Sequence, residues 1–340
     1  MRITRSRISQ SDIARIAGVT QPAVSLILGG KAVTIPETTR ERVLGIARDL
    51  GYRADPVARR LATGRSQILG VFTYERIFSP AQRSLYHPFL IGVEEAAEET
   101  GHDLLLLTSA ATPGSARSIH AGGEHKLRLV DAAVLLGRDE IPAELEELTA
   151  EGYPFVFIGR RFLPDGREVP NVAPDYTRST RDLAARLASA GHHQVGYVGT
   201  NPELPATAAR LAGLRSGELL VVPYFLKVTE VDEPLIAGID ALGISAVVAE
   251  NVVYAAALRA AAREHGLSVP DDLSLLVAGV SEDDEAGAQW SGYRIPSREV
   301  GRLAVQEVLR QLDGSPPRTR LVDCPTQAGT TLRPHRSLSE

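Results

Sequence analysis

Apolar residues at helical spacing outline two short helices in the opening part of the chain. The apolar positions repeat every three or four residues, first at Ile13, Ile16 and Ala17 and then at Val24, Ile27 and Leu28. Ser9 with Asp12 three residues later resembles a capping box at the start of the first helix, and Gly18 suits the turn that ends it. A helix-turn-helix is therefore predicted over residues 9–30, and such a motif can place its second helix in the major groove of DNA.

Two more helices are expected before residue 67. The segment from Pro36 to Leu50 carries an apolar face at helical spacing, and Gly51 follows it. Asp55 and Pro56 then form a helix start, with Asp55 as the capping residue and Pro56 as the first helical residue, and this helix ends near Gly64. The opening segment is thus predicted to be all α-helical.

From Ile68 onward, short apolar runs alternate with amphipathic helices. The runs have the length of strands and are rich in Val, Leu and Ile: Ile68–Phe72, Leu104–Leu107, Ala132–Leu136, Phe155–Ile158, Val195–Val198, Leu219–Val222, Ala246–Ala249 and Leu273–Val277. The intervening helices include Phe89–Thr100, Thr180–Ala190, Val253–Glu264 and Arg298–Leu312. This alternation predicts an α/β body of two doubly wound, Rossmann-like lobes. The joint is expected in the loop Arg161–Pro170, with small ligands bound between the lobes.

Charge separates the two parts of the chain. Residues 1–67 carry twelve basic and five acidic residues, whereas the whole chain carries 37 basic and 42 acidic ones. A basic head on an acidic body is typical of a nucleic-acid-binding module joined to another domain. The alternative to a DNA-binding head is that residues 1–67 form a small helical bundle within an enzyme.

Composition and motifs narrow the class of protein further. A length of 340 residues with 44% apolar content suits two or three folded domains. The single cysteine, Cys324, excludes a disulfide framework within one chain and is expected to be an inert thiol in a reducing, cytoplasmic setting. No membrane segment, secretion signal, Walker loop, nucleophile elbow or zinc-protease motif is found, so no membrane partner and no cofactor are expected. The pair His192-His193 follows Gly191, where histidine stabilises a helix end, and no metal ligand is expected there.

The opening segment resembles the DNA-binding head of the lactose-repressor (LacI/GalR) family. The shared motifs are Ser9-x-x-Asp12-Ile13-Ala14-x-x-Ala17-Gly18-Val19-Thr20-x-x-x-Val24-Ser25, Thr39-Arg40-x-Arg42-Val43 and Leu50-Gly51-Tyr52. The body continues the family's order with His87-Pro88-Phe89-Leu90-x-Gly92-Val93-Glu94, Gly191-His192-x-x-Val195-Gly196-Tyr197-Val198-Gly199 and Val269-Pro270-Asp271-Asp272-Leu273-Ser274. The head is specific to this family, and the body is shared with periplasmic sugar-binding proteins. The resemblance covers nearly the whole chain.

The resemblance implies a homodimer in which each head reads half of a pseudo-palindromic DNA operator. Gln21, Pro22 and Leu26 fall at the base-reading positions, where Gln can bond adenine and Leu can contact a thymine methyl group. Many relatives have a polar or basic residue at the position of Leu26, so the operator preference stays open. Leu61 matches a leucine that the family wedges between central base pairs, the alternative being ordinary packing. The expected DNA contacts are Ser9, Thr20, Gln21, Pro22, Ser25, Leu26, Tyr52, Ala58, Arg59 and Leu61.

The effector site that the resemblance implies departs from the family pattern. Gly279 stands where many relatives have an Asp that holds sugar hydroxyls, and Trp290 is expected either to support a sugar ring or to belong to the core. The expected effector contacts are Tyr74, Arg76, Phe78, His87, Phe89, Arg160, Arg210, Asn251 and Trp290. Three alternatives remain for the ligand: a neutral sugar, an acidic or phosphorylated molecule, or none because the pocket has degenerated.

These observations divide the chain into a head at residues 1–54, a hinge helix and linker at 55–67, and an effector-binding and dimerisation core at 68–340. Within the core, the first lobe is expected at 68–162 with 294–322 and the second at 163–293 with 323–336. The tail lacks leucine heptads, which favours a dimer over a tetramer. The chain is interpreted as an operator-binding transcriptional repressor controlled by a small molecule. The alternatives are a DNA-binding regulator without an effector, a head that binds DNA without sequence preference and, with no catalytic motif in its favour, an enzyme.

Overall fold

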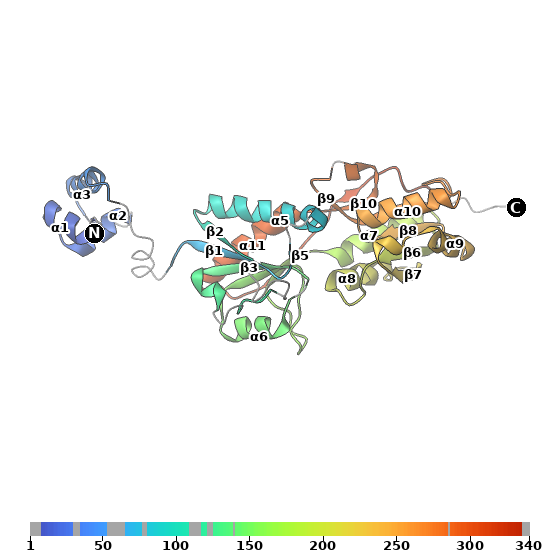
Figure 1. Cartoon of the computed structure of the whole chain (residues 1–340), viewed down its shortest axis with the longest axis horizontal. Coiled ribbons are helices and arrows are strands. Elements are labelled where there is room, and N and C mark those ends of the chain that lie inside the picture. The colour runs from blue at the N-terminus through green and yellow to red at the C-terminus, as the bar shows by residue number, and fades with distance from the viewer. Residues whose placement is uncertain are drawn as a thin grey trace, which may run out of the picture. The chain divides into compact units, whose positions relative to one another are not determined.

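The structure is a computed structural model that describes residues 8–29, 35–52, 65–76, 80–108, 117–120, 125–138, 140–284 and 286–334. It divides into two compact units, Met1–Ser66 and Gln67–Glu340 (Figure 1). Each unit is described by itself. Among the described residues, no helix is long and apolar enough to cross a membrane.

The first unit is a small helical domain. It contains α1 (Gln10–Ala17), α2 (Gln21–Leu28) and α3 (Glu37–Asp49). The capping box between Ser9 and Asp12 is formed, and Gly18 ends α1 in the left-handed conformation with φ 65°. The apolar stripes of the three helices meet in one core that includes Ile13, Val24 and Val43. The helix predicted from Asp55 lies outside the described residues.

The first lobe of the second unit is built on a parallel sheet. In the described residues its strand order is β11-β5-β4-β3-β1-β2. The strands are β1 (Ile68–Thr73), β2 (Asp103–Leu107), β3 (Ala132–Leu136), β4 (Phe155–Ile158), β5 (Asn171–Pro174) and β11 (Thr319–Val322). The helix α5 (Pro80–Glu99) lies on one face of the sheet, together with α11 (Ser297–Leu312), and α6 (Pro142–Ala150) lies on the other (Figure 1).

Strand β3 shows why this sheet needs helices on both faces. All of its residues are buried. Val134 and Leu136 pack toward α5 and α11, while Ala133 and Leu135 pack toward α6. Because successive strand residues point to opposite faces, an unbroken apolar run requires two covering layers. A short 3-10 helix, η1 (Lys126–Leu129), precedes β3.

The second lobe repeats this plan. Its strand order in the described residues is β12-β10-β9-β8-β6-β7, parallel except for the pair of β10 and β12. The strands are β6 (Gln194–Gly199), β7 (Leu220–Phe225), β8 (Ala246–Ala249), β9 (Ser274–Ser281), β10 (Ser291–Ile295) and β12 (Thr326–Gln327). One face packs against α7 (Tyr176–Ser189) and α8 (Pro205–Leu214), and the other against α9 (Glu233–Ala241) and α10 (Val252–Glu264). Two 3-10 helices are also present: η2 (Val228–Glu230) lies between β7 and α9 in the chain, and η3 (Ala286–Gln289) lies between β9 and β10.

The fold class predicted from the sequence is confirmed: an all-α head precedes an α/β body of two doubly wound lobes. Each sheet nevertheless has six strands in the described residues rather than the four expected from apolar runs. Since β5 belongs to the first sheet, the chain enters the second lobe at Asp175, and the expected joint at Arg161–Pro170 lies within the first lobe. Strand β10 likewise belongs to the second sheet, so the chain returns to the first lobe after Ile295.

Candidate functional site

One face of α2 is exposed in the helical unit. Gln21, Pro22 and Leu26 are exposed, and 44% of the surface of Leu26 is accessible, whereas Val24 and Ile27 on the opposite side are buried. The hydroxyl of Thr20 accepts a hydrogen bond from the Ala23 N–H at 3.4 Å and caps the helix. The exposed face therefore presents side chains that the fold of this unit does not require.

The side chain of Gln21 is held in place by α1. Its Nε2 donates to Oε1 of Gln10 at 2.7 Å. An amide group has two N–H donors and one carbonyl acceptor, so Gln21 retains one donor and its Oε1 for another partner. That remaining pair is the set that recognises adenine in the major groove.

The other predicted DNA contacts have different surroundings. Ser9 is engaged as the cap of α1, because its hydroxyl accepts a hydrogen bond from the Asp12 N–H at 3.2 Å and donates one to Oδ2 of Asp12 at 2.7 Å. Ser25 is half-buried, and Tyr52 packs against the helical core. Ala58, Arg59 and Leu61 lie outside the described residues.

A cavity of about 740 Å³ lies in the second unit where strands of both lobes end. Its walls come from α5, the loops after β3 and β6, the start of α10, and the ends of β9 and β10: Leu85, His87, Pro88, Arg138, Thr200, Val228, Asn251, Val252, Val253, Tyr254, Gly279, Ser281, Asp283, Asp284, Ile295 and Ser297. Its volume suits a small organic ligand.

Two of the predicted effector contacts, His87 and Asn251, line this cavity. The Oδ1 atom of Asn251 accepts hydrogen bonds from the N–H groups of Val253 at 3.0 Å and Tyr254 at 3.2 Å, so the residue caps α10. Within the described part of the chain, its NH₂ group has no acceptor. The helix start thus holds Asn251 in place and leaves two donors for a ligand.

Arg138 brings a positive charge to the same cavity, and Glu75 orients it. The backbone N–H of Arg138 donates to Oε1 of Glu75 at 2.9 Å, and its Nη2 donates to Oε2 at 3.3 Å. The hydroxyl of Tyr86 also donates to Glu75. Burial opposes the charged form of Arg138, but the hydrogen bonding and charge of Glu75, together with Tyr86, outweigh it and raise the pKa of Arg138. Arg138 is therefore a fixed, charge-balanced part of the wall.

Arg210 is buried beside this cavity but does not line it. Its Nε donates to the carbonyl oxygen of Ala278 at 2.9 Å, and its Nη1 lies 3.4 Å from Oε1 of Glu250. Its guanidinium also covers the ring of Tyr176 at 3.8 Å. The protein thus already provides partners for the Arg210 side chain, which the sequence singled out for an effector.

Three other predicted effector contacts belong to the hydrophobic cores. Tyr74 and Phe89 pack in the first lobe, and Trp290 packs in the second lobe. Trp290 is 3% exposed, and the guanidinium of Arg259 covers its ring at 4.4 Å. The structure therefore places Trp290 in the core, the alternative that the sequence left open, and not in the wall of the cavity.

The remaining predicted contacts are dispersed. Arg76 is exposed and does not line the 740 Å³ cavity, and Phe78 lies outside the described residues. Arg160 lines a second cavity of about 500 Å³ near the start of α7. There its Nε donates to Oε1 of Glu168 at 2.7 Å, which raises the pKa of Arg160. Arg160 is thus paired within the protein.

Two features that the sequence analysis assigned no chemistry also have structural roles. His192 is buried, with Nδ1 2.7 Å from the Ser245 hydroxyl and Nε2 3.0 Å from the Arg333 carbonyl oxygen. Cys324 is 9% exposed, and burial raises the pKa of its thiol to about 11. Such a thiol is a weak nucleophile at neutral pH.

Sequence analysis did not identify several residues of the cavity wall. Thr200 directly follows β6, Arg138 comes after β3 and Gly137, Ser281 ends β9, and Ser297 begins α11. The rule that ligands bind at the carboxyl ends of parallel strands could have selected Arg138, Thr200 and Ser281 from the apolar runs alone. Ser297 follows β10, a strand that the apolar pattern did not predict.

Comparisons with known proteins agree with this architecture. Residues 184–331 match the family model of the periplasmic binding protein-like domain. The HTH-type transcriptional regulator AscG of Escherichia coli is 26% identical over 334 residues, which cover 91% of this chain and 94% of AscG. The structure of the Lac repressor dimer bound to operator and the anti-inducer ONPF has a TM-score of 0.71 at 18% identity, covering 96% of this chain and 99% of the other. The regulator CelR in complex with cellobiose has a TM-score of 0.59 at 23% identity, covering 96% and 100%.

The helical unit, the two-lobed body and relatives that align along almost the whole chain lead to one assignment. Along almost its whole length the chain is similar to transcriptional regulators of the lactose-repressor (LacI/GalR) family.

Proposed function

We propose that this protein is a sequence-specific repressor that binds a pseudo-palindromic DNA operator as a homodimer. In this proposal, a neutral sugar or sugar derivative in the 740 Å³ cavity controls the affinity for DNA. The observation that carries the proposal is the exposed face of α2, on which Gln21 and Leu26 project from a helix whose other side is buried.

Gln21 and Leu26 supply different kinds of base recognition. The N–H donor and Oε1 acceptor of Gln21 that are unpaired among the described residues suit an adenine edge, and the exposed apolar side chain of Leu26 suits a thymine methyl group. Arg42 and Arg48 are exposed on α3, and such residues contribute binding to phosphate that is independent of sequence. The head therefore has the chemistry for both affinity and specificity.

The charges around the cavity favour a neutral ligand over a phosphorylated one. Among the described residues, the wall carries Arg138, Asp283 and Asp284 as charged side chains, and Arg138 is already paired with Glu75. A phosphate group would meet two carboxylates and a single neutralised guanidinium, which is unfavourable. Asn251, Thr200 and Ser281 instead offer amide and hydroxyl groups to a polyhydroxylated molecule. The relative CelR was solved with cellobiose, a ligand of this chemical class.

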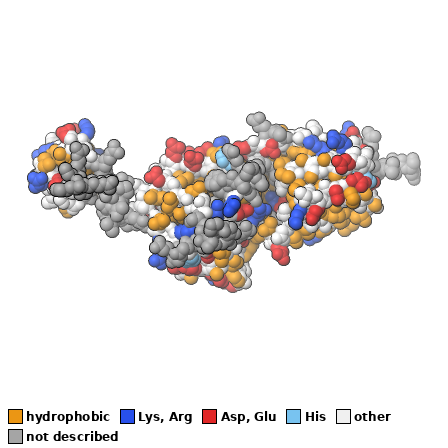
Figure 2. Space-filling view, in the orientation of Figure 1, with side chains coloured by type: hydrophobic (Ala, Val, Ile, Leu, Met, Phe, Trp, Pro, Cys, Tyr) orange, Lys and Arg blue, Asp and Glu red, His pale blue; other side chains and the backbone are white. Residues whose placement is uncertain are grey.

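Edge strands support the proposed homodimer. Strand β2 is at one edge of the first sheet, with Leu104 and Leu106 36% and 41% exposed. Strand β7 is at an edge of the second sheet, with Leu220 60% exposed. Figure 2 also shows hydrophobic side chains gathered on the visible face of the second lobe. Exposed apolar edges are commonly covered by a second subunit.

Control of DNA binding follows from the position of the cavity. A ligand that contacts both lobes favours one arrangement of the lobes over another, and only such a differential contact can shift the equilibrium. A coupling of about 1–3 kcal/mol changes DNA affinity roughly 5- to 150-fold. The sign of this effect depends on which arrangement the ligand prefers.

The experiment is selection of duplexes from a random DNA pool, followed by binding measurements at fixed salt. Gln21→Ala should lose discrimination at one base pair in each half-site by about 1–3 kcal/mol. Gln10→Ala is the matched control, because it removes the hydrogen-bond partner of Gln21 but keeps the Gln21 amide that is proposed to contact the base. Equal affinity of the wild-type protein for all duplexes would refute sequence-specific recognition.

The second candidate function is a DNA-binding regulator without a small-molecule effector. It is favoured by Gly279, which contributes no side chain to the cavity, and by Arg210, which is already bound to Glu250. A thermal-shift screen of sugars separates the two, because a ligand that binds the folded state raises the melting temperature. A shift that Asn251→Ala abolishes supports an effector, and no shift with any sugar supports the second candidate.

A further inference from the structure

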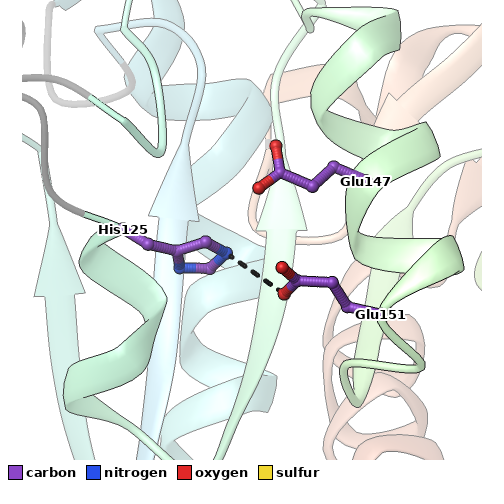
Figure 3. Close-up of side chains that lie close together, drawn as sticks. All are labelled: His125, Glu147 and Glu151. Carbon is purple, nitrogen blue, oxygen red and sulfur yellow. Dashed lines mark ion pairs between the residues drawn. The ribbon is translucent and has the colours of Figure 1, made fainter.

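A cluster of two histidines and two glutamates lies on the first lobe, outside the cavity described above. Glu147 and Glu151 come from α6 and its end, and His120 and His125 come from the chain that precedes η1. Figure 3 shows the imidazole ring of His125 directed toward the two carboxylates. More than twenty residues separate the histidines from the glutamates, so no local spacing in the sequence reveals the cluster.

Three side chains of this cluster lie within reach of one common ion, and His120 is hydrogen-bonded to one of them. One ligand atom each from His125, Glu147 and Glu151 lies within 4.8 Å of the other two. Nε2 of His120 is 2.8 Å from Oε2 of Glu147, and Nε2 of His125 is 4.0 Å from Oε2 of Glu151. The rings of His120 and His125 pack edge to face at 5.1 Å.

His125 is the unusual member, because its side chain is buried without satisfying its polar atoms. The side chain is 6% exposed, and neither ring nitrogen has a hydrogen-bond partner in the described part of the chain. Burial of an unpaired polar group costs free energy, so such groups in a folded protein usually have a partner that is not yet accounted for. His192, also buried, has partners at both ring nitrogens.

Buried Glu144 fixes the geometry of the cluster. It shares one face of α6 with Glu147 and Glu151, since the three residues are three and four positions apart. The carboxylate of Glu144 accepts hydrogen bonds from the Ser118 hydroxyl and, at 3.3 Å, from the Ile119 N–H. This holds the chain at residues 118–119 against the helix, directly before His120. The fold therefore holds the backbone segments that carry these side chains close together.

We propose that His120, His125, Glu147 and Glu151 form a binding site for a divalent transition metal ion, with Zn²⁺ as the best match. Zinc favours four ligands, and imidazole nitrogen and carboxylate oxygen are among its usual ligands, at about 2.0–2.2 Å. Ligand atoms around a tetrahedral ion of that size are roughly 3.4 Å apart, which is near the spacing of the ligand atoms of His125, Glu147 and Glu151, all within 4.8 Å of one another. Mg²⁺ and Ca²⁺ suit it poorly, because they prefer all-oxygen sites.

Charge and access also suit a cation. Two carboxylates with two neutral imidazoles carry two negative charges, which a divalent ion neutralises. The side chains of His120, Glu147 and Glu151 are 36%, 40% and 44% exposed, so an ion can enter from solvent. The buried His125 would then gain a partner for one ring nitrogen. This inference does not rest on the proposed operator or effector.

The experiment measures zinc binding by the untagged, metal-stripped full-length protein, using equilibrium dialysis and titration calorimetry with zinc chloride. The expected result is one tight site per chain. His125→Gln and Glu147→Gln should each weaken that site at least about tenfold, since loss of residues that merely support metal ligands already costs about 10–100-fold. A tetrahedral Co²⁺ absorption spectrum that His125→Gln abolishes would identify the site independently of stability.

Two controls make the result specific. Glu146→Gln changes an exposed carboxylate on another face of α6, and zinc affinity should stay unchanged. His265→Gln alters another histidine with acidic neighbours, Glu233 and Asp240, and should also leave the site intact. Circular dichroism of each metal-free variant verifies that it folds. Absence of zinc binding by the wild-type protein, or a site that folded His125→Gln retains at full affinity, would overturn the proposal.

Discussion

Arg210 and Glu250 form a buried ion pair directly beside Gly279. Nη1 of Arg210 is 3.4 Å from Oε1 of Glu250, and Nη2 is 3.4 Å from the place that a Cβ atom of residue 279 would occupy. Where the family resemblance implies an Asp at position 279, this chain has no carboxylate, and Glu250, at the end of β8, is the carboxylate paired with the arginine. Thr200 and Thr207 complete the hydrogen bonding of Glu250.

The first prediction concerns this ion pair. Glu250→Ala leaves the guanidinium of Arg210 buried without a counter-charge, and loss of one partner of a buried pair costs about 3–5 kcal/mol. The midpoint of urea unfolding, monitored by the fluorescence of buried Trp290, should therefore fall sharply. Glu264→Ala removes an exposed carboxylate and is the control. Equal midpoints for the two variants would show that the pair does not stabilise the second lobe.

The second prediction concerns Gly279 itself. Its φ is +129°, and a Cβ there would lie 2.8 Å from Cδ1 of Ile295. Gly279→Ala should reduce the free energy of unfolding by about 1–3 kcal/mol, because it adds backbone strain to a steric clash.

Gly238 provides the opposite case. A Cβ there has open space around it inside α9, so Gly238→Ala should stabilise the protein by about 0.4–1 kcal/mol. Unfolding midpoints that move in the same direction for both variants would contradict this interpretation of the two sites.

The third prediction separates DNA recognition from stability. Leu26 is exposed, so Leu26→Gln should change the free energy of unfolding by less than about 0.5 kcal/mol. The same variant should change which bases are preferred in each half-site, measured by competition at one salt concentration. Val24→Ala, on the buried side of α2, should instead lower stability. An unchanged base preference for Leu26→Gln would exclude Leu26 from base recognition.

The fourth prediction is a pH dependence at Glu168. Hydrogen bonds from Arg160 lower the pKa of Glu168, against the opposing effect of burial. The folded-state pKa thus lies below the unfolded value of about 4.3, so the stabilisation is present above that value and is lost as the pH falls through the folded-state pKa. The pair is partly exposed, which keeps the effect near the 0–1 kcal/mol typical of surface pairs.

The pH dependence at Glu168 is measured as the melting temperature of the wild-type protein minus that of Glu168→Gln. That difference should be positive at pH 7 and should shrink as the pH approaches 3. A difference in melting temperature that stays constant, or that grows in acid, would contradict the lowered pKa of Glu168.

Prediction from the sequence succeeded where a local pattern determines the structure. The capping box, Gly18 and the apolar stripes define the helix-turn-helix, and long Val- and Leu-rich runs define the buried strands. Strand β5 was missed because its apolar residues Val172 and Ala173 are only two and lie between Asn171 and Pro174, and β11 because most of its residues are exposed. Without these strands, the joint between the lobes could not be placed.

The candidate site was predictable only in part, for a different reason. Asn251 at a helix start and His87 on α5 were identified and line the cavity. Trp290 could not be assigned, because its burial depends on packing against residues far along the chain, and the partners of Arg210 come from three separate elements. The cluster around His125 depends entirely on such long-range contacts.

A footprint of the full-length protein on a duplex selected from a random pool tests the central claim most directly. Two protected half-sites related by two-fold symmetry are expected, with a separation of about 34–36 Å or a multiple of it between their centres. Protection should also be lost steeply as salt increases. A footprint without two-fold symmetry, or equal protection of unrelated sequences at the same salt concentration, would contradict it.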